Sequence, residues 1–310
     1  MSSRPEQHSF AHRLAEAIAA TGTVLCVGID PHPGLMPAAF GGTEQPAGSA
    51  PAVQHLRAFT ACVIEAAAGR VPAIKPQAAF FERHGPGGMQ ILAEAAKNAR
   101  ERGLLVIMDA KRGDIGSTAQ AYAEAWLGPQ ALFASDALTV NPYLGFDSLE
   151  PFMSRAEDTK SGLFILVRTS NKGSADLQQL EAEGKPVWAH LAAGLAPYID
   201  RLIDRPSGLS SLGIVVGATG PDEARAVRQM LPTAPFLIPG YGAQGASADD
   251  ALAGLITDAQ TKRYTGGLVN ASRAITHGQA VQDARTADEA KQAMTAAIEA
   301  AAKDLSAGKA

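Results

Sequence analysis

The sequence is poor in cysteine and holds no long apolar run. Only two cysteines, Cys26 and Cys62, occur among its 310 residues, and neither belongs to a CxxC pair. A disulfide framework is therefore not expected. The N-terminal segment MSSRPEQHSF lacks the apolar stretch of a signal peptide, and no apolar run reaches the roughly 18 residues of a transmembrane helix. We expect a protein of the reducing cytoplasm that does not span a membrane.

Positive charge is not in excess either. The 27 lysines and arginines are outnumbered by 31 aspartates and glutamates, which gives a net charge of −4. Such a chain has no bulk electrostatic attraction for nucleic acid or for an anionic membrane surface. Its 46% hydrophobic and 19% charged residues are typical of a folded globular protein, which excludes general disorder. An anionic ligand must therefore be bound by a local pocket.

Eight short apolar runs recur along the chain, and each is followed by a polar or glycine-rich turn. They cover residues 23–29, 71–74, 104–108, 137–140, 163–167, 213–216, 235–238 and 267–269. The runs are nearly continuous rather than alternating, which is typical of strands buried on both faces of a parallel sheet. Helical patterns lie between them, for example at 89–102, 118–127 and 222–231. This alternation predicts an α/β fold, a single (β/α)₈ TIM barrel.

A doubly wound open sheet is the alternative fold. Its most specific signal, GxGxxG directly after the first strand, is absent, because the first run continues into GIDPHPG. We expect one domain over residues 1–310, with the barrel core at about 20–282. An extra loop at 40–51, a long polar stretch at 170–187 and a C-terminal helix at about 285–305 decorate it. Long loops of this kind often act as lids or binding loops.

The most polar strand end follows the third run. Catalytic residues of such barrels lie at the C-terminal ends of the strands. Asp109, Lys111 and Asp114 follow the third run, and Asp30 and Lys75 follow the first and second. The two-residue period of a strand places Asp109 and Lys111 on one face. An isolated Asp–Lys pair is more often a structural ion pair, but the other two charges at the same edge favour a functional site.

These charges have a chemical consequence. Two carboxylates and two ammonium groups packed together form an alternating array, in which every charge has an opposite neighbour and stays ionised. A lysine held in this way is a positioned acid. A Schiff-base lysine would need the opposite, a lowered pKa.

The ends of the seventh and eighth runs form a second cluster. Glycines at 240, 242 and 245 allow a close approach of the backbone, and Gln244 offers an amide. Arg273 follows the eighth run and carries a fork-shaped group suited to phosphate. A glycine motif alone is also typical of an ordinary turn. Combined with Arg273, it predicts a phosphate site, because barrels often bind phosphate at these two loops.

Several motifs together carry a resemblance to a known family. The segment DAKRGDIGSTAQAYA at 109–123 resembles the DxKxxDI signature of orotidine 5′-phosphate decarboxylases. The segments IKPQAAFFE, VNPYLG, VRTSNKGS and PGYGAQG, which begin at residues 74, 140, 167 and 239, are similar to the longer bacterial branch of that family. The similarity extends from GID at Gly28 to ASRAI at Ala271, with the motifs in order at the expected strand ends. This combination is far more specific than DxKxxD alone.

The resemblance implies a reaction and a set of catalytic residues. Enzymes of this family convert orotidine 5′-phosphate (OMP) to UMP and CO2 in pyrimidine biosynthesis, without a metal or an organic cofactor, at sites shared across a homodimer interface. By this resemblance Asp109 lies against the substrate carboxylate, and Lys111 stabilises and protonates the carbanion at C6. Asp114 and Thr118 reach into the partner subunit's site.

The resemblance also implies the substrate-binding residues. Asp30 and Lys75 bind the ribose hydroxyls and order the charged array. Ser170 bonds to the amide edge of the pyrimidine. The phosphate is held by Gln244, Arg273 and backbone N–H groups near Gly242.

Three other functions use similar residues. Mg²⁺-dependent keto-sugar-phosphate enzymes share DxKxxD, but their sites look like metal sites, with a carboxylate at the end of strand two. This sequence has Lys75 at that position, which would repel a divalent cation. A class I aldolase would use Lys75 or Lys111 as a Schiff-base amine, but Asp109 and Asp114 would keep that amine protonated. A non-catalytic phosphosugar-binding barrel is expected to lack Asp109, Lys111 or Asp114, and all three are present.

Overall fold

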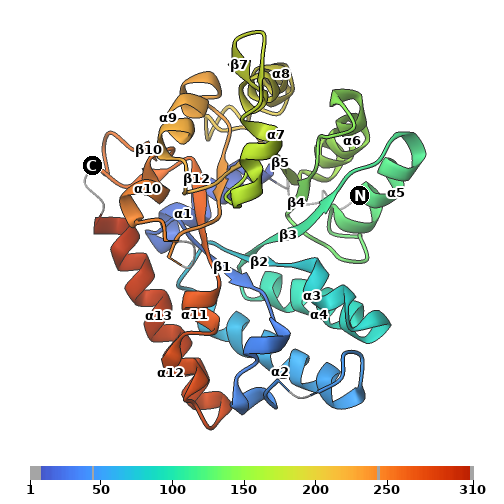
Figure 1. The fold of residues 1–310 in the computed structure, drawn as a ribbon, viewed down its shortest axis with the longest axis vertical. Coiled ribbons are helices and arrows are strands. Elements are labelled where there is room, and N and C mark those ends of the chain that lie inside the picture. The colour runs from blue at the N-terminus through green and yellow to red at the C-terminus, as the bar shows by residue number, and fades with distance from the viewer. Residues whose placement is uncertain (1–7, 44, 243–244, 308–310) are drawn as a thin grey trace, which may run out of the picture.

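The barrel predicted from the apolar runs is the fold that the chain adopts. The structure, a computed structural model, describes residues 8–43, 45–242 and 245–307. Eight parallel strands close in the order β1-β12-β9-β8-β5-β4-β3-β2, with helices around them (Figure 1). The strands are β1 (Leu25–Ile29), β2 (Ala73–Pro76), β3 (Leu105–Arg112), β4 (Ala137–Val140), β5 (Gly162–Arg168), β8 (Leu212–Val216), β9 (Phe236–Ile238) and β12 (Gly267–Ala271).

Burial follows the predicted pattern. Every residue of β1, β2, β4, β8, β9 and β12 is buried, as expected for strands between a packed interior and a layer of helices. The end of β3 differs from the prediction, because the apolar run ends at Met108 whereas the strand continues to Arg112. The register with β4 shifts between these two residues, so the polar segment DAKR continues the strand irregularly.

Helices connect the strands and cover the outside of the barrel. The patterns expected at 89–102, 118–127 and 222–231 are confirmed as α4, α5 and α9. The longer helices are α1 (Phe10–Thr21), α2 (Ala50–Ala67), α4 (Gly85–Glu101), α5 (Gly116–Trp126), α6 (Glu150–Thr159), α8 (Val187–Arg201), α9 (Pro221–Met230) and α13 (Ala287–Ala307). The short ones are η1 (Pro33–Leu35), η2 (Ala38–Phe40), α3 (Ala78–Glu82), η3 (Phe146–Leu149), η4 (Lys172–Ser174), α7 (Ala175–Gln178), α10 (Ala248–Leu252), α11 (Arg273–Thr276) and α12 (Gln279–Gln282).

Helix α1 closes the end of the barrel at which the strands begin. Phe10 is fully buried and meets the ring of Phe164 edge to face, with 5.9 Å between ring centroids. It also fills the space beside Gly162 at the start of β5, where a Cβ atom would lie 2.2 Å from the Phe10 ring. The opposite end, where the strands finish, is left free for a pocket.

The three predicted decorations have defined structures. The loop at 40–51 is followed by α2, which already begins at Ala50, and residue 44 lies outside the described part of the chain. The stretch at 170–187 contains η4, α7 and a hairpin of β6 (Glu181–Ala182) and β7 (Lys185–Pro186). A second hairpin joins β10 (Ile256–Thr257) to β11 (Tyr264–Thr265). The C-terminal helix α13 packs along α2 on the outside of the barrel. Among the described residues, no helix has the length and apolar character to cross a membrane.

Candidate active site

A pocket of about 300 Å³ opens at the C-terminal ends of the barrel strands. Every strand contributes to it, either directly or through the residue that follows. One lining residue from each strand in chain order is Asp30, Lys75, Asp109, Thr139, Leu166, Val215, Leu237 and Asn270. The pocket therefore lies where barrel enzymes carry their chemistry.

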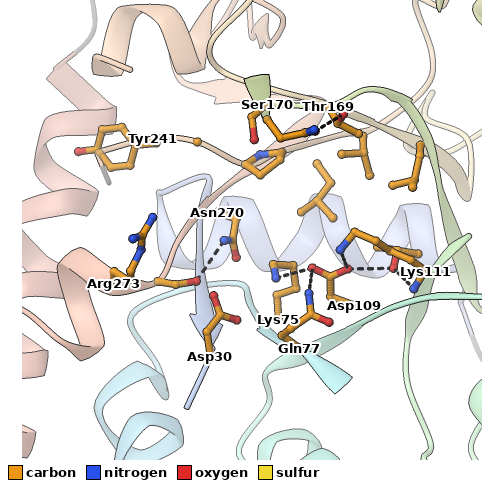
Figure 2. Close-up of a pocket in the computed structure, with 18 residues that line it drawn as sticks. Asp30, Lys75, Gln77, Asp109, Lys111, Thr169, Ser170, Tyr241, Asn270 and Arg273 are labelled. Carbon is orange, nitrogen blue, oxygen red and sulfur yellow. Dashed lines mark hydrogen bonds and ion pairs between the residues drawn. The ribbon is translucent and has the colours of Figure 1, made fainter. Parts of the chain in front are cut away.

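The carboxylate of Asp109 is the centre of one end of the pocket (Figure 2). Its Oδ2 accepts hydrogen bonds from Lys75 Nζ at 2.7 Å and Gln77 Nε2 at 3.1 Å. Its Oδ1 accepts from Lys111 Nζ at 2.6 Å and Thr139 Oγ1 at 3.1 Å. We call these five residues the Asp109 cluster. Four donors satisfy a carboxylate that is only 7% exposed, so its position is fixed.

Neighbouring charges keep the buried side chains of Asp109 and Lys75 ionised. Burial favours a neutral Asp109, but the ammonium groups of Lys75 and Lys111 outweigh it and hold the pKa of Asp109 well below its ordinary value. Burial likewise favours a neutral Lys75, but the carboxylates of Asp109 and Asp30 raise the Lys75 pKa above its ordinary value. The expected alternation of charges is thus present for Lys75, Asp109 and Lys111, whereas Asp30 forms no ion pair within the described part of the chain and acts on Lys75 only through its charge. Lys75 is the reverse of a Schiff-base lysine, which needs a lowered pKa.

Lys111 reaches Asp109 through an irregular backbone rather than through regular strand alternation. Its φ is +47°, in the left-handed region that is costly for a residue with a side chain. The Lys111 N–H donates to Thr139 Oγ1 at 2.9 Å, and the same hydroxyl donates to Asp109. Thr139 therefore holds both the strained backbone and the carboxylate. The Lys111 side chain is 45% exposed and lines the pocket, so its ammonium group is accessible to a ligand.

Asp114 and Thr118 do not line the pocket of their own chain. Asp114 Oδ1 accepts a hydrogen bond from the N–H of Ile115 at 2.7 Å, and Thr118 is exposed on α5. Neither residue forms a hydrogen bond or ion pair with a member of the Asp109 cluster. Large apolar side chains are exposed in the loops after β3 and β4: Ile115, which follows Asp114 in the sequence, is 60% exposed, and Tyr143 is 75% exposed.

The opposite end of the pocket is formed by Arg273 and the loop after β9. Arg273 begins α11, and Tyr241 belongs to the loop. The Tyr241 hydroxyl donates to Asp304 Oδ2 on α13 at 2.6 Å. Gly242 is not among the lining residues, and its N–H donates to the Ala246 carbonyl at 3.1 Å. Gln244, which the resemblance assigns to phosphate binding, lies outside the described residues.

Thr169 and Ser170, at the point where β5 leads into the long loop, line one side of the pocket. Gln178 of α7 fastens this segment: its Oε1 accepts from the Thr169 N–H at 2.9 Å, and its Nε2 donates to Thr169 Oγ1 at 2.8 Å. The decorated stretch at 170–187 is thus tied directly to the pocket wall.

Two lining residues carry buried acceptors without donors. Within the described part of the chain, Asp30 Oδ1 and Asn270 Oδ1 have no hydrogen-bond partner. Buried polar atoms are seldom left unsatisfied, and their presence in a pocket indicates a place for a ligand or water.

Several lining residues receive no role from the sequence, and four of them are Gln77, Thr139, Asn270 and Ser272. Gln77 follows Lys75 by two positions, so the strand period could have placed it on the same face. Thr139 is a polar residue in an otherwise apolar run, and this is also a usable signal. The roles of Asn270 and Ser272 depend on contacts between strands distant in sequence.

Comparison with known proteins identifies one family by its family model and by individual relatives. The family model described as orotidine 5′-phosphate decarboxylase / HUMPS family matches residues 23–290. An orotidine 5′-phosphate decarboxylase from Rhodopirellula baltica is 42% identical over 271 residues, covering 86% of this chain and 88% of the relative. One from Deinococcus radiodurans is 41% identical over 286 residues, covering 92% and 95%.

Solved structures are similar over nearly the whole chain. The structure of Leishmania donovani OMP decarboxylase has a TM-score of 0.69 and 33% identity, and the match covers 96% of this chain and 97% of the other. A Streptomyces avermitilis chain gives a TM-score of 0.76 at 36% identity, with 97% of both chains covered.

Proposed function

The chain belongs to the orotidine 5′-phosphate decarboxylase / HUMPS family, and we propose that its barrel-end pocket is where it converts orotidine 5′-phosphate to UMP and CO2. The observation that carries this proposal is the ionised Asp109 between two lysines, one of which remains open to a ligand. The Mg²⁺-dependent and non-catalytic alternatives find no support in the curated relatives, which are named as decarboxylases.

Lys111 acts on the reacting carbon. As the bond between C6 and the carboxylate breaks, CO2 leaves and the electron pair stays on C6. The Lys111 ammonium stabilises this developing negative charge and then transfers a proton to C6, which gives UMP and a neutral amine. The fixed Asp109 carboxylate orients the ammonium and lies close to the substrate carboxylate, where like charges disfavour the bound ground state.

Lys75 holds Asp109 in place and, with Asp30, binds the ribose. Its ammonium is already bonded to Asp109 and lies in the field of Asp30. Ser170 bonds to the amide edge of the pyrimidine from the side of the pocket that it lines with Thr169.

Arg273 binds the phosphate, together with Gln244 and the backbone near Gly242. The phosphate is remote from the bond that breaks, but its binding energy can position the reacting end. The Gly242 N–H now donates to Ala246, so it must exchange that carbonyl for a phosphate oxygen. We therefore expect the loop after β9 to rearrange when the nucleotide binds.

A homodimer completes the site. Ile115, between Asp114 and Thr118 in the sequence, and Tyr143 and Leu144 in the loop after β4 expose apolar side chains, as a face made for a second copy does. In the dimer Asp114 joins the partner's charged array. Mixing inactive Lys111→Ala and Asp114→Ala chains should restore part of the activity, because some hybrid dimers carry one intact site. Exchanged mixtures that stay inactive would contradict a shared site.

We assign the enzyme to the cytoplasm and to pyrimidine nucleotide synthesis. The activity named for its curated relatives and two buried cysteines that form no disulfide support this assignment.

The direct test follows the absorbance change as the purified protein converts OMP to UMP, with and without EDTA. We expect full turnover in both samples, because no side chain of the proposed mechanism needs a metal. Absent turnover would refute the assignment, and turnover abolished by EDTA would refute the mechanism.

A further inference from the structure

The middle of the pocket contains an acceptor to which the mechanism gives no function. Asn270 lies in β12 and is 8% exposed. Its Nδ2 donates to Ser272 Oγ at 3.4 Å, whereas its Oδ1 is buried and has no donor among the described residues. Leaving such a buried atom unsatisfied destabilises the free protein, because the atom has lost its bonds to water and gained none in exchange. A ligand that supplies the missing donor removes this destabilisation.

The position of Asn270 indicates which part of the ligand meets it. Figure 2 shows Asn270 next to Asp30, with Arg273 on one side and Lys75 and Asp109 on the other. In the proposed function, on which this inference rests, the phosphate binds at Arg273 and the pyrimidine at the Asp109 cluster. The sugar joins these two groups and must pass Asn270.

We propose that Asn270 is a further substrate-binding residue, whose Oδ1 accepts a hydrogen bond from a ribose hydroxyl of the nucleotide. A ribose hydroxyl is a donor of the required kind, and the phosphate at neutral pH is chiefly an acceptor. Asn270 and Asp30 together then offer two acceptors to the two vicinal hydroxyls.

Gly28 and Ser272 position this amide. The Ser272 hydroxyl lies against the backbone of Gly28 in β1, so close that a Cβ atom at residue 28 would be 1.8 Å from Ser272 Oγ and 2.9 Å from its Cβ. The same Cβ would lie 3.2 Å from Asn270 Oδ1. The lack of a side chain at Gly28 therefore makes room for Ser272, which in turn holds the Asn270 Nδ2 and leaves Oδ1 for the ligand.

The first test measures binding of UMP, 2′-deoxy-UMP and 3′-deoxy-UMP to the wild-type protein and to Asn270→Ala by calorimetry. Asn270→Ala should weaken UMP binding about tenfold, the value of one hydrogen bond in a buried site. The penalty should disappear for the analogue that lacks the bonded hydroxyl. A penalty equal for all three nucleotides, or no penalty for UMP, would overturn the proposal. Asp30→Ala, which removes the second proposed acceptor, is measured with the same three nucleotides for comparison.

The second test examines the positioning role and does not depend on the fate of Asn270→Ala. Gly28→Ala should weaken UMP binding at least about tenfold in the wild-type background, because its Cβ displaces Ser272. In a Ser272→Gly background the same change should cost less than about twofold, since the clashing atoms are gone. Equal penalties in both backgrounds would show that Gly28 does not act through Ser272.

The outcomes separate this inference from the function on which it rests. A wild-type protein that neither binds UMP nor turns over OMP would refute the proposed function itself. A protein that does both would refute only the role of Asn270 if Asn270→Ala weakened the binding of all three nucleotides equally and Gly28→Ala had the same effect in both backgrounds.

Discussion

The two ends of the pocket satisfy their polar groups in different ways. At one end, Asp109 accepts four hydrogen bonds from neighbouring side chains. Toward the other end, Asp30 and Asn270 in the middle of the pocket carry buried acceptors without donors, and the guanidinium of Arg273 beyond them has no acceptor among the described residues. The first end is assembled before substrate arrives, whereas the second is completed by the nucleotide. Charged groups that are fixed in advance can stabilise the transition state without rearranging, whereas polar groups that lack a partner in the protein are available to bind the nucleotide.

The largest effect is expected at the assembled end. Lys111→Ala removes the ammonium that stabilises the carbanion and supplies its proton, and should lower kcat by at least about 10³-fold. UMP binding, which calorimetry measures separately, should change much less. Lys97→Ala, which removes an exposed lysine paired with Glu101 on α4, is the matched control. A Lys111→Ala variant with near-wild-type kcat would contradict the proposed proton donor.

Lys75→Met tests whether the Asp109 cluster stabilises the folded protein in the absence of a ligand. Losing one partner of a buried ion pair should lower the free energy of unfolding by about 3 kcal/mol without any ligand. Arg273→Ala, at the end that awaits a ligand, should change it by less than about 0.5 kcal/mol. Urea unfolding of both variants gives the comparison. Equal losses would remove the distinction between the two ends.

Acid should narrow the stability difference between wild type and Lys75→Met. The pKa of Asp109 is lowered in the folded protein, so its contribution is present above its ordinary value of 3.8 and is lost as pH falls through the lowered pKa. The Lys75 pKa is raised, so its contribution holds below its ordinary value of 10.5 and is lost only as pH rises through the raised pKa. Unfolding measured from pH 7 to pH 3 should show the difference shrinking below about pH 4.

Arg273→Ala should lower the affinity of the protein for UMP. Loss of a charge-assisted, two-pronged contact to phosphate is expected to weaken UMP binding about 10²-fold, measured by calorimetry. Arg225→Ala removes an exposed arginine that pairs with Asp222 on α9 and should leave binding unchanged. If Arg273→Ala binds UMP normally, the phosphate is held elsewhere.

The smallest effect concerns the C-terminal helix. Asp304→Ala removes the acceptor that anchors the Tyr241 hydroxyl to α13, and should weaken UMP binding about threefold through the loop after β9. Burial and the Asp304 carboxylate raise the pKa of Tyr241 above its ordinary value, so this phenol stays protonated and keeps donating. Tyr241→Phe should not add to Asp304→Ala, while Asp288→Ala on the same helix should have no effect. Additive penalties would contradict an action through this bond.

The barrel could be predicted because its strands are nearly continuous apolar runs, and this pattern needs no knowledge of distant contacts. The irregular end of β3 could not, because nothing in the polar segment after Met108 signals the register shift with β4 that occurs before Arg112. The left-handed backbone of Lys111 is also invisible in sequence. It depends on the Thr139 hydroxyl, which a neighbouring strand supplies.

The charges of the site were predictable, but the way they are satisfied was not. Residue types at strand ends brought Asp109, Lys75 and Lys111 together, since a barrel collects all its strand ends at one edge. The proposed orientation of Asn270 depends on the contact between Ser272 and Gly28. Strand β1, which carries Gly28, and strand β12, which ends one residue before Ser272, meet only in the closed barrel. No local pattern encodes such a contact.

A pair of crystal structures, one without ligand and one with UMP, tests the difference between the two ends most directly. We predict that the Asp109 cluster is the same in both, with Lys75 and Lys111 at hydrogen-bond distance from the carboxylate. We predict that only in the complex do Asp30 and Asn270 gain ribose donors and Arg273 a phosphate. An Asp109 cluster that forms only with nucleotide present, or a nucleotide whose sugar lies away from Asn270, would contradict this division of the pocket.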